Sequence, residues 1–355
     1  MRLLTVNKIK EDMVCAKTVF TANGTILINK GTKIKYNYIE RLLKHGIKRI
    51  YIENDLIGDI EIDDIIKDEA IQKAISIVDS TMNNISYYQE IDIEQIRSVL
   101  NTIIKDLFDN NNLIVQIMEI RAINEYTLEH CVKVAVLSLL TGLTLGYSKD
   151  ELMDLGTGAI LHDVGKALIP KEIINKPSQL TKKEYDIIKE HTNLGYKAIR
   201  RQNCVNDKVC EIILLHHERY DGKGYPTGLK GDEIPEYVKI VSIADVYDAL
   251  TTDRVYRKRV EVSMAIEYLM SMGGIQFDYT LVRKFIKNIA LYPIGKGIIL
   301  NTKEKGFVVN NFKNFPTRPV VKIVYDSDGK KLSEPYEINL INSNTITIVA
   351  TFNDV

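Results

Sequence analysis

The chain has 355 residues, of which 45% are hydrophobic and 26% charged, a composition typical of a soluble globular protein with two or three domains. Its 47 basic residues balance 47 acidic ones, so nothing in the net charge favours a nucleic acid polymer or a membrane as a partner. The four cysteines form no CxxC pair and suggest no disulfide framework. We therefore expect reduced thiols and a cytoplasmic protein.

The N-terminal residues 1–58 are expected to form a small α+β module. Met13 to Leu27 has the pattern of a strand, a turn and a second strand. A helix is expected at about Tyr36 to Lys44 and a short strand at Arg49 to Ile52. Nothing in this module predicts a binding site.

Helices are expected from about residue 65 to residue 290, because apolar residues there recur at spacings of three and four. The polar run Asp109 to Asn112 breaks the first part of this pattern. Residues 59–114 are predicted to be a helical linker region. Its apolar stripes would be covered either by a second subunit, giving a homodimer through helices 65–115, or by the helices that follow.

The most apolar stretch of the chain, Val134 to Leu145, contains Ser138, Thr141 and Thr144. It is too short to span a bilayer, so we predict a buried helix there. Further along, Thr181 with Glu184 three residues later has the pattern of a helix N-terminus.

The composition changes after Tyr292-Pro293. Residues 293–355 are expected to form a small β-rich module, because short β-rich runs follow one another at Gly297–Asn301, Gly306–Asn310, Pro319–Tyr325 and Thr345–Thr351. The predicted fold class is therefore mainly α: an all-helical bundle at residues 115–292 between an α+β module and a β-rich module.

Histidines gather in the helical region. Five of the six fall within about 90 residues, namely His130, His162, His191, His216 and His217, and Asp163 and Asp245 stand among them. A lone histidine or aspartate in a core helix is more often simply hydrogen-bonded than a metal ligand. A whole set in one domain favours a metal centre, because imidazole and carboxylate together suit zinc, manganese or iron.

Three positions carry further chemistry. If the segment is helical, Lys166 lies on the same face as His162 and Asp163 and could donate to a phosphate. The adjacent His216 and His217 would need the open geometry of a helix end to bind one ion. Asp245 lies in an apolar helix, where a carboxylate is costly unless it binds a metal or pairs with a charge.

These motifs resemble a known family. His162-Asp163 with Gly165-Lys166 resembles the HD motif of the HD phosphohydrolase superfamily. The run from His216 to Pro226 resembles the extended motif of its HD-GYP branch. Further similar segments are Tyr126 to His130, Asp245 to Arg257 and Gly274 to Asp278, although Tyr279 stands where the family usually has proline. The likeness covers about residues 115–290.

The resemblance implies an all-α bundle that hydrolyses the bacterial second messenger cyclic di-GMP to pGpG or onward to GMP. Carried over by motif, the first metal would be bound by His130, His162, Asp163 and Asp245, and the second by Asp163, His191, His216 and His217. Family members with a third metal usually carry glutamate at the position of Tyr126. We therefore expect two divalent ions, iron or manganese, with other ions left open.

The resemblance also assigns substrate contacts. Lys166 would be a catalytic donor to the phosphate, and Gly222, Gly224 and Tyr225 would form a loop that faces the substrate. Arg254 and Arg257 would clamp a phosphate. Judged by spacing alone, the loop could be only a tight turn and the two arginines only solvated helix charges.

Two other functions stay open. The domain could be a non-catalytic cyclic di-GMP receptor, although its full ligand set argues against a degenerate sensor. It could also hydrolyse another cyclic dinucleotide such as cyclic GMP-AMP, which the Gly-Tyr-Pro loop does not exclude.

Overall fold

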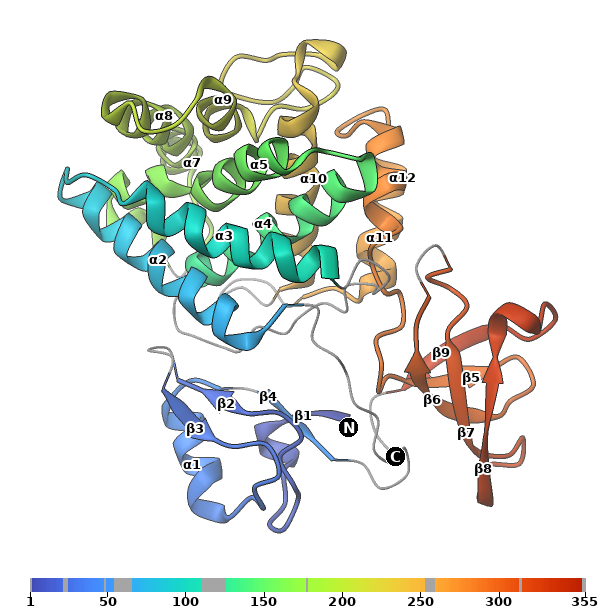
Figure 1. Cartoon of the computed structure of the whole chain (residues 1–355). Helices are drawn as coiled ribbons and strands as arrows, with labels where there is room; N and C mark the ends of the chain where they lie inside the picture. Colours follow the sequence, from blue (N-terminus) through green and yellow to red (C-terminus); the bar gives the residue numbers. More distant parts are fainter. Residues whose placement is uncertain are drawn as a thin grey trace. The chain divides into compact units, whose positions relative to one another are not determined.

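The structure, a computed structural model, describes residues 2–21, 25–47, 49–53, 66–109, 126–176, 178–252, 259–312 and 315–352. Two compact units make up the chain. One holds residues 66–111 and 125–286, and the other holds residues 1–65, 112–124 and 287–355. The expected fold class, mainly α with an α+β and a β-rich module, is confirmed (Figure 1).

The larger unit is helical. Its elements in chain order are α2 (Asp68–Ser86), α3 (Ile93–Asp109), α4 (Tyr126–Leu145), α5 (Lys149–Leu161), the 3-10 helix η2 (Val164–Leu168), α6 (Lys171–Ile174), α7 (Lys182–Lys189), α8 (His191–Gln202), α9 (Asp207–Leu215), the 3-10 helix η3 (Gly231–Glu233), α10 (Glu236–Thr251), α11 (Val262–Ser271) and α12 (Tyr279–Ile286). Helix α4 is central, since α2, α5, α10 and α12 all contact it. Its segment Leu128–Leu145 is apolar enough to cross a membrane, but 78% of it is buried inside the protein, as in the core helix of a soluble protein.

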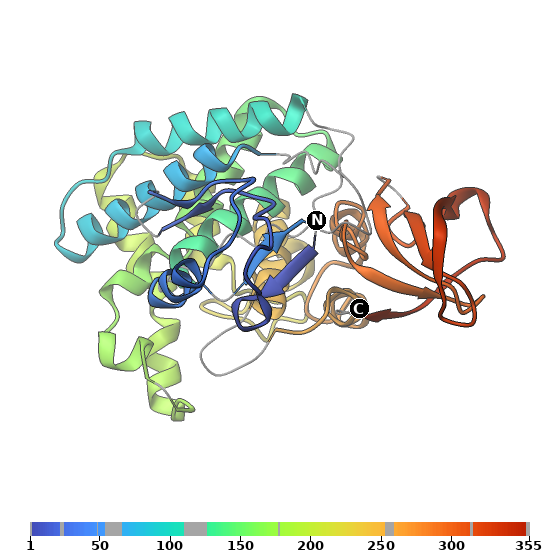
Figure 2. The ribbon, with the colours of Figure 1, turned by 90° about the horizontal axis from the view of Figure 1, so that it is seen from below.

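Helices α2 and α3 lie side by side in both views (Figure 1 and Figure 2). The helical run breaks at Tyr87–Asp92, which the sequence did not predict, and α3 ends at Asp109 as expected. The apolar stripe of α3 is buried, and α3 contacts α4 and α5. The helices that follow therefore cover this stripe. A homodimer through this region stays a prediction.

The predicted start of a helix at Thr181 is confirmed. The Thr181 hydroxyl accepts a hydrogen bond from the Glu184 amide at 3.3 Å, and the Thr181 amide donates to the Glu184 carboxylate at 2.7 Å. This reciprocal pair satisfies two backbone donors that a helix start otherwise leaves unpaired. Lys176 adds an ion pair to the same carboxylate at 2.7 Å. The first turn of α7 is thus firmly held.

The N-terminal module contains β1 (Arg2–Thr5), the 3-10 helix η1 (Val6–Lys8), β2 (Val19–Phe20), β3 (Ile26–Ile28), α1 (Tyr36–Lys44) and β4 (Arg49–Ile52). β1 pairs antiparallel with β4, and β2 with β3. Helix α1, strand β4 and the β2–β3 pair match the sequence expectation, whereas β1 and η1 were not predicted. Their shared core includes the fully buried Val19, Ile34 and Leu42.

The C-terminal module is one antiparallel sheet. Its strands are β5 (Gly297–Leu300), β6 (Lys305–Asn310), β7 (Val320–Tyr325), β8 (Lys331–Asn339) and β9 (Ile348–Phe352), in the order β8-β7-β6-β5-β9. The sequence predicted four of these strands but not β8, which is largely exposed and contains Pro335. Proline is tolerated in β8 because the strand lies at an edge of the sheet.

Candidate metal centre

The candidate ligands come from helix ends and helix interiors of the larger unit. Helix α5 ends at Leu161, and the chain then enters η2 instead of continuing as an α-helix through Lys166. The helical spacing used to relate His162, Asp163 and Lys166 is therefore wrong, yet Lys166 still forms an ion pair with Asp163. Helix α9 ends at Leu215, so His216 and His217 have the helix-end geometry they need.

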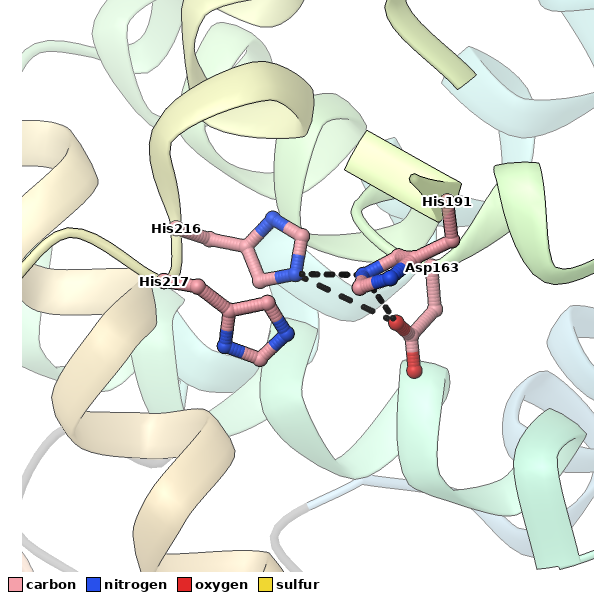
Figure 3. Close-up of side chains that lie close together, drawn as sticks. All are labelled: Asp163, His191, His216 and His217. Atoms are coloured by element: carbon pink, nitrogen blue, oxygen red, sulfur yellow. Dashed lines mark hydrogen bonds and ion pairs between the residues drawn. The ribbon is translucent and has the colours of Figure 1, made fainter. Parts of the chain in front are cut away.

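The structure brings all seven predicted ligand residues into two adjoining groups. His130, His162 and Asp245 form the first, and Asp163, His191, His216 and His217 form the second. Within each group the ligand atoms lie within 4.8 Å of one another. Figure 3 shows the second group, in which the imidazole of His191 and both rings of the histidine pair face Asp163.

Asp163 faces both groups. Its Oδ2 atom lies 3.4 Å from His162 Nε2 and 3.7 Å from His130 Nε2. Its Oδ1 atom lies 3.3 Å from His191 Nε2 and 3.9 Å from His216 Nε2. One carboxylate oxygen is thus available to each group, as a bridging ligand requires.

Asp245 makes a second connection. From the interior of α10, its carboxylate lies 3.1 Å from His130 Nε2 and 3.7 Å from His217 Nδ1. A carboxylate without a partner would be costly to bury in an apolar helix, but that of Asp245 has a partner in each of the two groups.

Hydrogen bonds behind the rings fix the orientation of three histidines. Nδ1–H of His162 donates to the Ala159 carbonyl and that of His191 to the Ile188 carbonyl, both at 2.7 Å. His216 donates in the same way to the Ile213 carbonyl at 3.1 Å. Since Nδ1 carries the proton, Nε2 keeps its lone pair and points toward Asp163, which is how proteins hold imidazole ligands of metals.

The residues fit divalent ions on structural grounds. Within the described part of the chain, His162 Nε2 and Asp163 Oδ1 are buried and have no hydrogen-bond partner. A buried polar atom without one costs about 1–3 kcal/mol. Both atoms belong to the candidate ligand set, so a bound cation would supply the partner that each needs.

The protonation states also suit metal binding. Burial lowers the pKa of His191 to about 4 and that of His217 to about 3, although Asp163 and Asp245 act in the opposite direction. Burial likewise holds the pKa of His216 well below its usual range. These rings are neutral at pH 7. Burial would raise the pKa of Asp163, but Lys166 and His162 outweigh it and hold that pKa well below the usual value.

His130 behaves differently because Asp248 stands behind it. Asp248 Oδ2 lies 2.7 Å from His130 Nδ1, and both side chains are buried. Burial opposes a proton on this ring, but hydrogen bonds to Asp245 and Asp248 outweigh burial and raise the pKa of His130 to about 9. Asp248 orients a candidate ligand and is not one of the seven.

The loop after His217 closes over the second group. The Tyr225 ring lies 4.7 Å from the His217 ring, with the two planes 32° apart. A side chain on Gly224 would overlap the backbone between His217 and Arg219, so only glycine fits there. At Gly222 the amide donates to the Arg219 carbonyl at 2.8 Å and turns the chain.

Glu218 anchors this loop from inside, which the sequence did not predict. One oxygen of its buried carboxylate accepts hydrogen bonds from the Thr227 amide at 2.7 Å and the Gly228 amide at 3.0 Å. The sequence also gave no sign that Lys189 on α7 approaches this loop, with its ammonium 5.8 Å from the centre of the Tyr225 ring. Arg254, Arg257 and the side chain of Tyr126 lie outside the described residues.

Comparison with known families agrees with this geometry. A family model for the HD domain matches residues 114–281, and one for a KOW domain associated with the HD domain matches residues 298–354. The solved structure of Bd1817, a HDG"Y"P protein from Bdellovibrio bacteriovorus, has a TM-score of 0.54 and is 18% identical. The match covers 80% of this chain and 97% of the Bd1817 chain, which supports the fold.

Two curated relatives are similar in sequence. The cyclic di-GMP phosphodiesterase PA4108 of Pseudomonas aeruginosa is 30% identical over 242 residues, covering 68% of this chain and 58% of the relative. The 3′3′-cGAMP-specific phosphodiesterase 2 of Vibrio cholerae is 32% identical over 194 residues, covering 51% of this chain and 37% of the relative. The chain thus spans less than two thirds of the length of either relative.

Fold and site together define an HD domain, a helical bundle with histidine and aspartate at its centre. The Gly-Tyr-Pro loop beside the histidine pair specifies the branch. The chain belongs to the HD-GYP family.

Proposed function

We propose that this protein is a metal-dependent phosphodiesterase that hydrolyses cyclic di-GMP to pGpG, GMP or both. The observation that carries the proposal is the position of Asp163, with one carboxylate oxygen toward each of two buried histidine groups. The relatives named as cyclic di-GMP phosphodiesterases support the substrate class. Since cyclic di-GMP is an intracellular messenger, the proposal implies a cytoplasmic enzyme.

The proposed cofactors are two divalent ions, iron or manganese. His130, His162, Asp163 and Asp245 would hold one, and Asp163, His191, His216 and His217 the other. Two such ions supply positive charge that lowers the pKa of water and offsets negative charge on a phosphodiester.

The reaction adds water across one phosphodiester. A new P–O bond forms, the bond from phosphorus to the 3′ oxygen breaks, and the 3′ oxygen leaves with a proton. Lys166, 29% exposed beside Asp163, would donate to a phosphoryl oxygen as negative charge develops there. The three neutral histidines of the second group leave their lone pairs free for ligation.

The loop would orient the ligand. Tyr225 covers His217, and Gly224 lets the backbone approach closely. We keep Arg254 and Arg257 as proposed phosphate clamps, since the planar guanidinium matches a phosphate with two parallel hydrogen bonds.

A second candidate is hydrolysis of cyclic GMP-AMP. The observation that favours it is the Vibrio cholerae relative named as specific for 3′3′-cGAMP. The alternative that is not an enzyme is a receptor that binds cyclic di-GMP without hydrolysing it.

The test is turnover by protein reconstituted anaerobically with Fe(II) or Mn(II), beside Asp163→Ala. We expect linear product from the wild type and none from the variant. Binding of cyclic di-GMP without turnover would overturn catalysis and favour the receptor. Turnover of 3′3′-cGAMP alone would move the assignment to the second candidate.

A further inference from the structure

We propose that Tyr185 and Lys189 of α7, together with Tyr225, form a subsite that binds one guanine base of the substrate. The proposal rests on the proposed function and deepens it, because it assigns residues that select guanine over adenine.

The contacts that define the subsite join two distant parts of the chain. The Lys189 ammonium lies 4.9 Å from the centre of the Tyr185 ring and 5.8 Å from the centre of the Tyr225 ring. Tyr225 in turn packs on His217 at 4.7 Å. A continuous row of side chains therefore leads from the candidate metal ligands to the surface of α7.

A pair four residues apart on a helix, such as Tyr185 and Lys189, is often only a solvated surface contact. The contact between Lys189 and Tyr225 has a different origin. Tyr225 belongs to the loop after His217, and nothing in the geometry of α7 requires it to meet this lysine. Lys189 also precedes the candidate ligand His191 by two residues, so the subsite and the metal centre are positioned by the same segment.

The two side chains on α7 are open to a ligand. Tyr185 is 48% exposed, and the Lys189 side chain is 32% exposed. Lys189 pairs with Asp186 at 2.8 Å, but the carboxylate of Asp186 is 53% exposed. Exposed ion pairs of this kind are weak, so the ammonium can exchange this partner for a ligand atom.

The chemistry of the three side chains matches guanine. Aromatic rings stack with the face of a base, and a lysine ammonium donates to the O6 and N7 acceptors that guanine presents on one edge. Adenine presents N7 but carries an amino donor in place of O6. Lys189 is therefore positioned to favour guanine, while Tyr185 would stack on either purine.

The substitution Tyr185→Trp tests the stacking directly, because the chain contains no tryptophan. In Mn(II)-loaded protein we expect cyclic di-GMP to quench the single indole with saturation. The control is Tyr87→Trp, whose parent side chain is 74% exposed on the turn between α2 and α3 and should show no quenching.

Quenching and turnover together decide both proposals. Specific quenching with turnover supports both, and specific quenching without turnover supports the subsite and overturns the proposed hydrolysis. Turnover without quenching, or equal quenching of the control, overturns the subsite. If neither quenching nor turnover is observed, both proposals are overturned.

Lys189→Met tests the selectivity. It should reduce the preference for cyclic di-GMP over cyclic di-AMP, measured as the ratio of their Kd values, by about tenfold, as expected for loss of a base-edge contact. Lys189→Arg should keep most of the preference, and Lys183→Met on the same helix should leave it unchanged. A purely structural lysine would weaken both ligands equally, and that result would overturn its role.

Discussion

Asp248 contacts a candidate ligand without being one of the seven candidate ligands itself. It contacts His130 Nδ1 at 2.7 Å and also accepts a hydrogen bond from the Thr252 hydroxyl at 3.0 Å. The first contact fixes the orientation of the His130 ring, and the second fixes Asp248 itself.

Asp248→Asn should weaken metal binding by about 10- to 100-fold, because the amide removes the negative charge behind His130. Competition with a metallochromic chelator measures the affinity. Asp232→Asn, whose parent side chain is 98% exposed, is the matched control. Equal metal affinity in the two variants would contradict this role.

The buried histidines predict the pH dependence of stability in metal-free protein. The folded pKa of His130, about 9, lies above its unfolded value of 6.5, so its contribution is complete below pH 6.5 and is lost as pH rises toward 9. For His191 the folded pKa of about 4 lies below 6.5, so stability is lost as pH falls from 6.5 toward 4. His217 acts in the same direction as His191.

Urea unfolding of chelator-treated protein should therefore show maximum stability near pH 6.5. His130→Gln should remove the loss of stability on the alkaline side and leave the loss on the acid side. An unchanged alkaline slope in that variant would show that another group is responsible.

Among the elements, η2 and α8 are held together by a glycine contact. A Cβ atom on Gly165 would overlap the backbone carbonyl of His191 and approach the Gly195 amide. Since η2 follows Asp163 and α8 begins at His191, this contact sets the distance between two candidate ligands.

Gly165→Ala should cost about 1–3 kcal/mol of unfolding free energy, because backbone atoms cannot yield as a side chain can. It should also lower the metal content of the purified protein. Gly142→Ala is the control, because its Cβ would meet only side-chain atoms, chiefly the methyl ends of Leu152 at 2.9 Å and Leu155 at 3.0 Å. Urea unfolding and elemental analysis measure both effects. Equal stability in the two variants would contradict the argument.

The sequence predicted those elements whose signal is local. The reciprocal cap at Thr181 and the apolar periodicity of α3 are complete within one segment, so both could be read directly. The ligand residues could be predicted as a set because their chemistry is unusual together. The strand β8 could not, because at a sheet edge it needs little apolar surface and tolerates Pro335.

Contacts between segments could not be predicted from the sequence, for a related reason. Nothing near Glu218 indicates that its carboxylate accepts from amides nine and ten residues later. The approach of Lys189 to Tyr225 depends on how two elements pack. The distribution of Asp163 oxygens over the two groups depends on the turn into η2, which replaced the expected helix.

At the scale of the whole molecule, α2 and α3 belong with the helical bundle. Ile96, Leu100 and Ile103 on α3 are fully buried, and a Cβ on Gly156 of α5 would lie 3.0 Å from the Leu100 side chain. The predicted domain boundaries near residues 58 and 115 fall outside the described residues and stay predictions.

A fragment of residues 66–292 should therefore fold and bind metal, whereas residues 115–292 alone should aggregate or unfold. Losing α2 and α3 would expose apolar surface of α4 and α5 to water. Each Å² of apolar surface exposed in this way would lower the free energy of unfolding by about 25 cal/mol. Circular dichroism melting and gel filtration of both fragments measure the difference. A cooperative melt of the shorter fragment would contradict the inference.

The proposed ligands lie on segments that are remote in sequence, from α4 through the α5–η2 junction, α8 and the end of α9 to α10. Each ion would consequently act as a reversible cross-link that closes large chain loops and exists only in the folded state. At a free metal concentration one hundred times Kd, such linkage adds about 2.7 kcal/mol per ion to stability. Metal scarcity in the cell would then lower the amount of folded protein as well as the activity of each molecule.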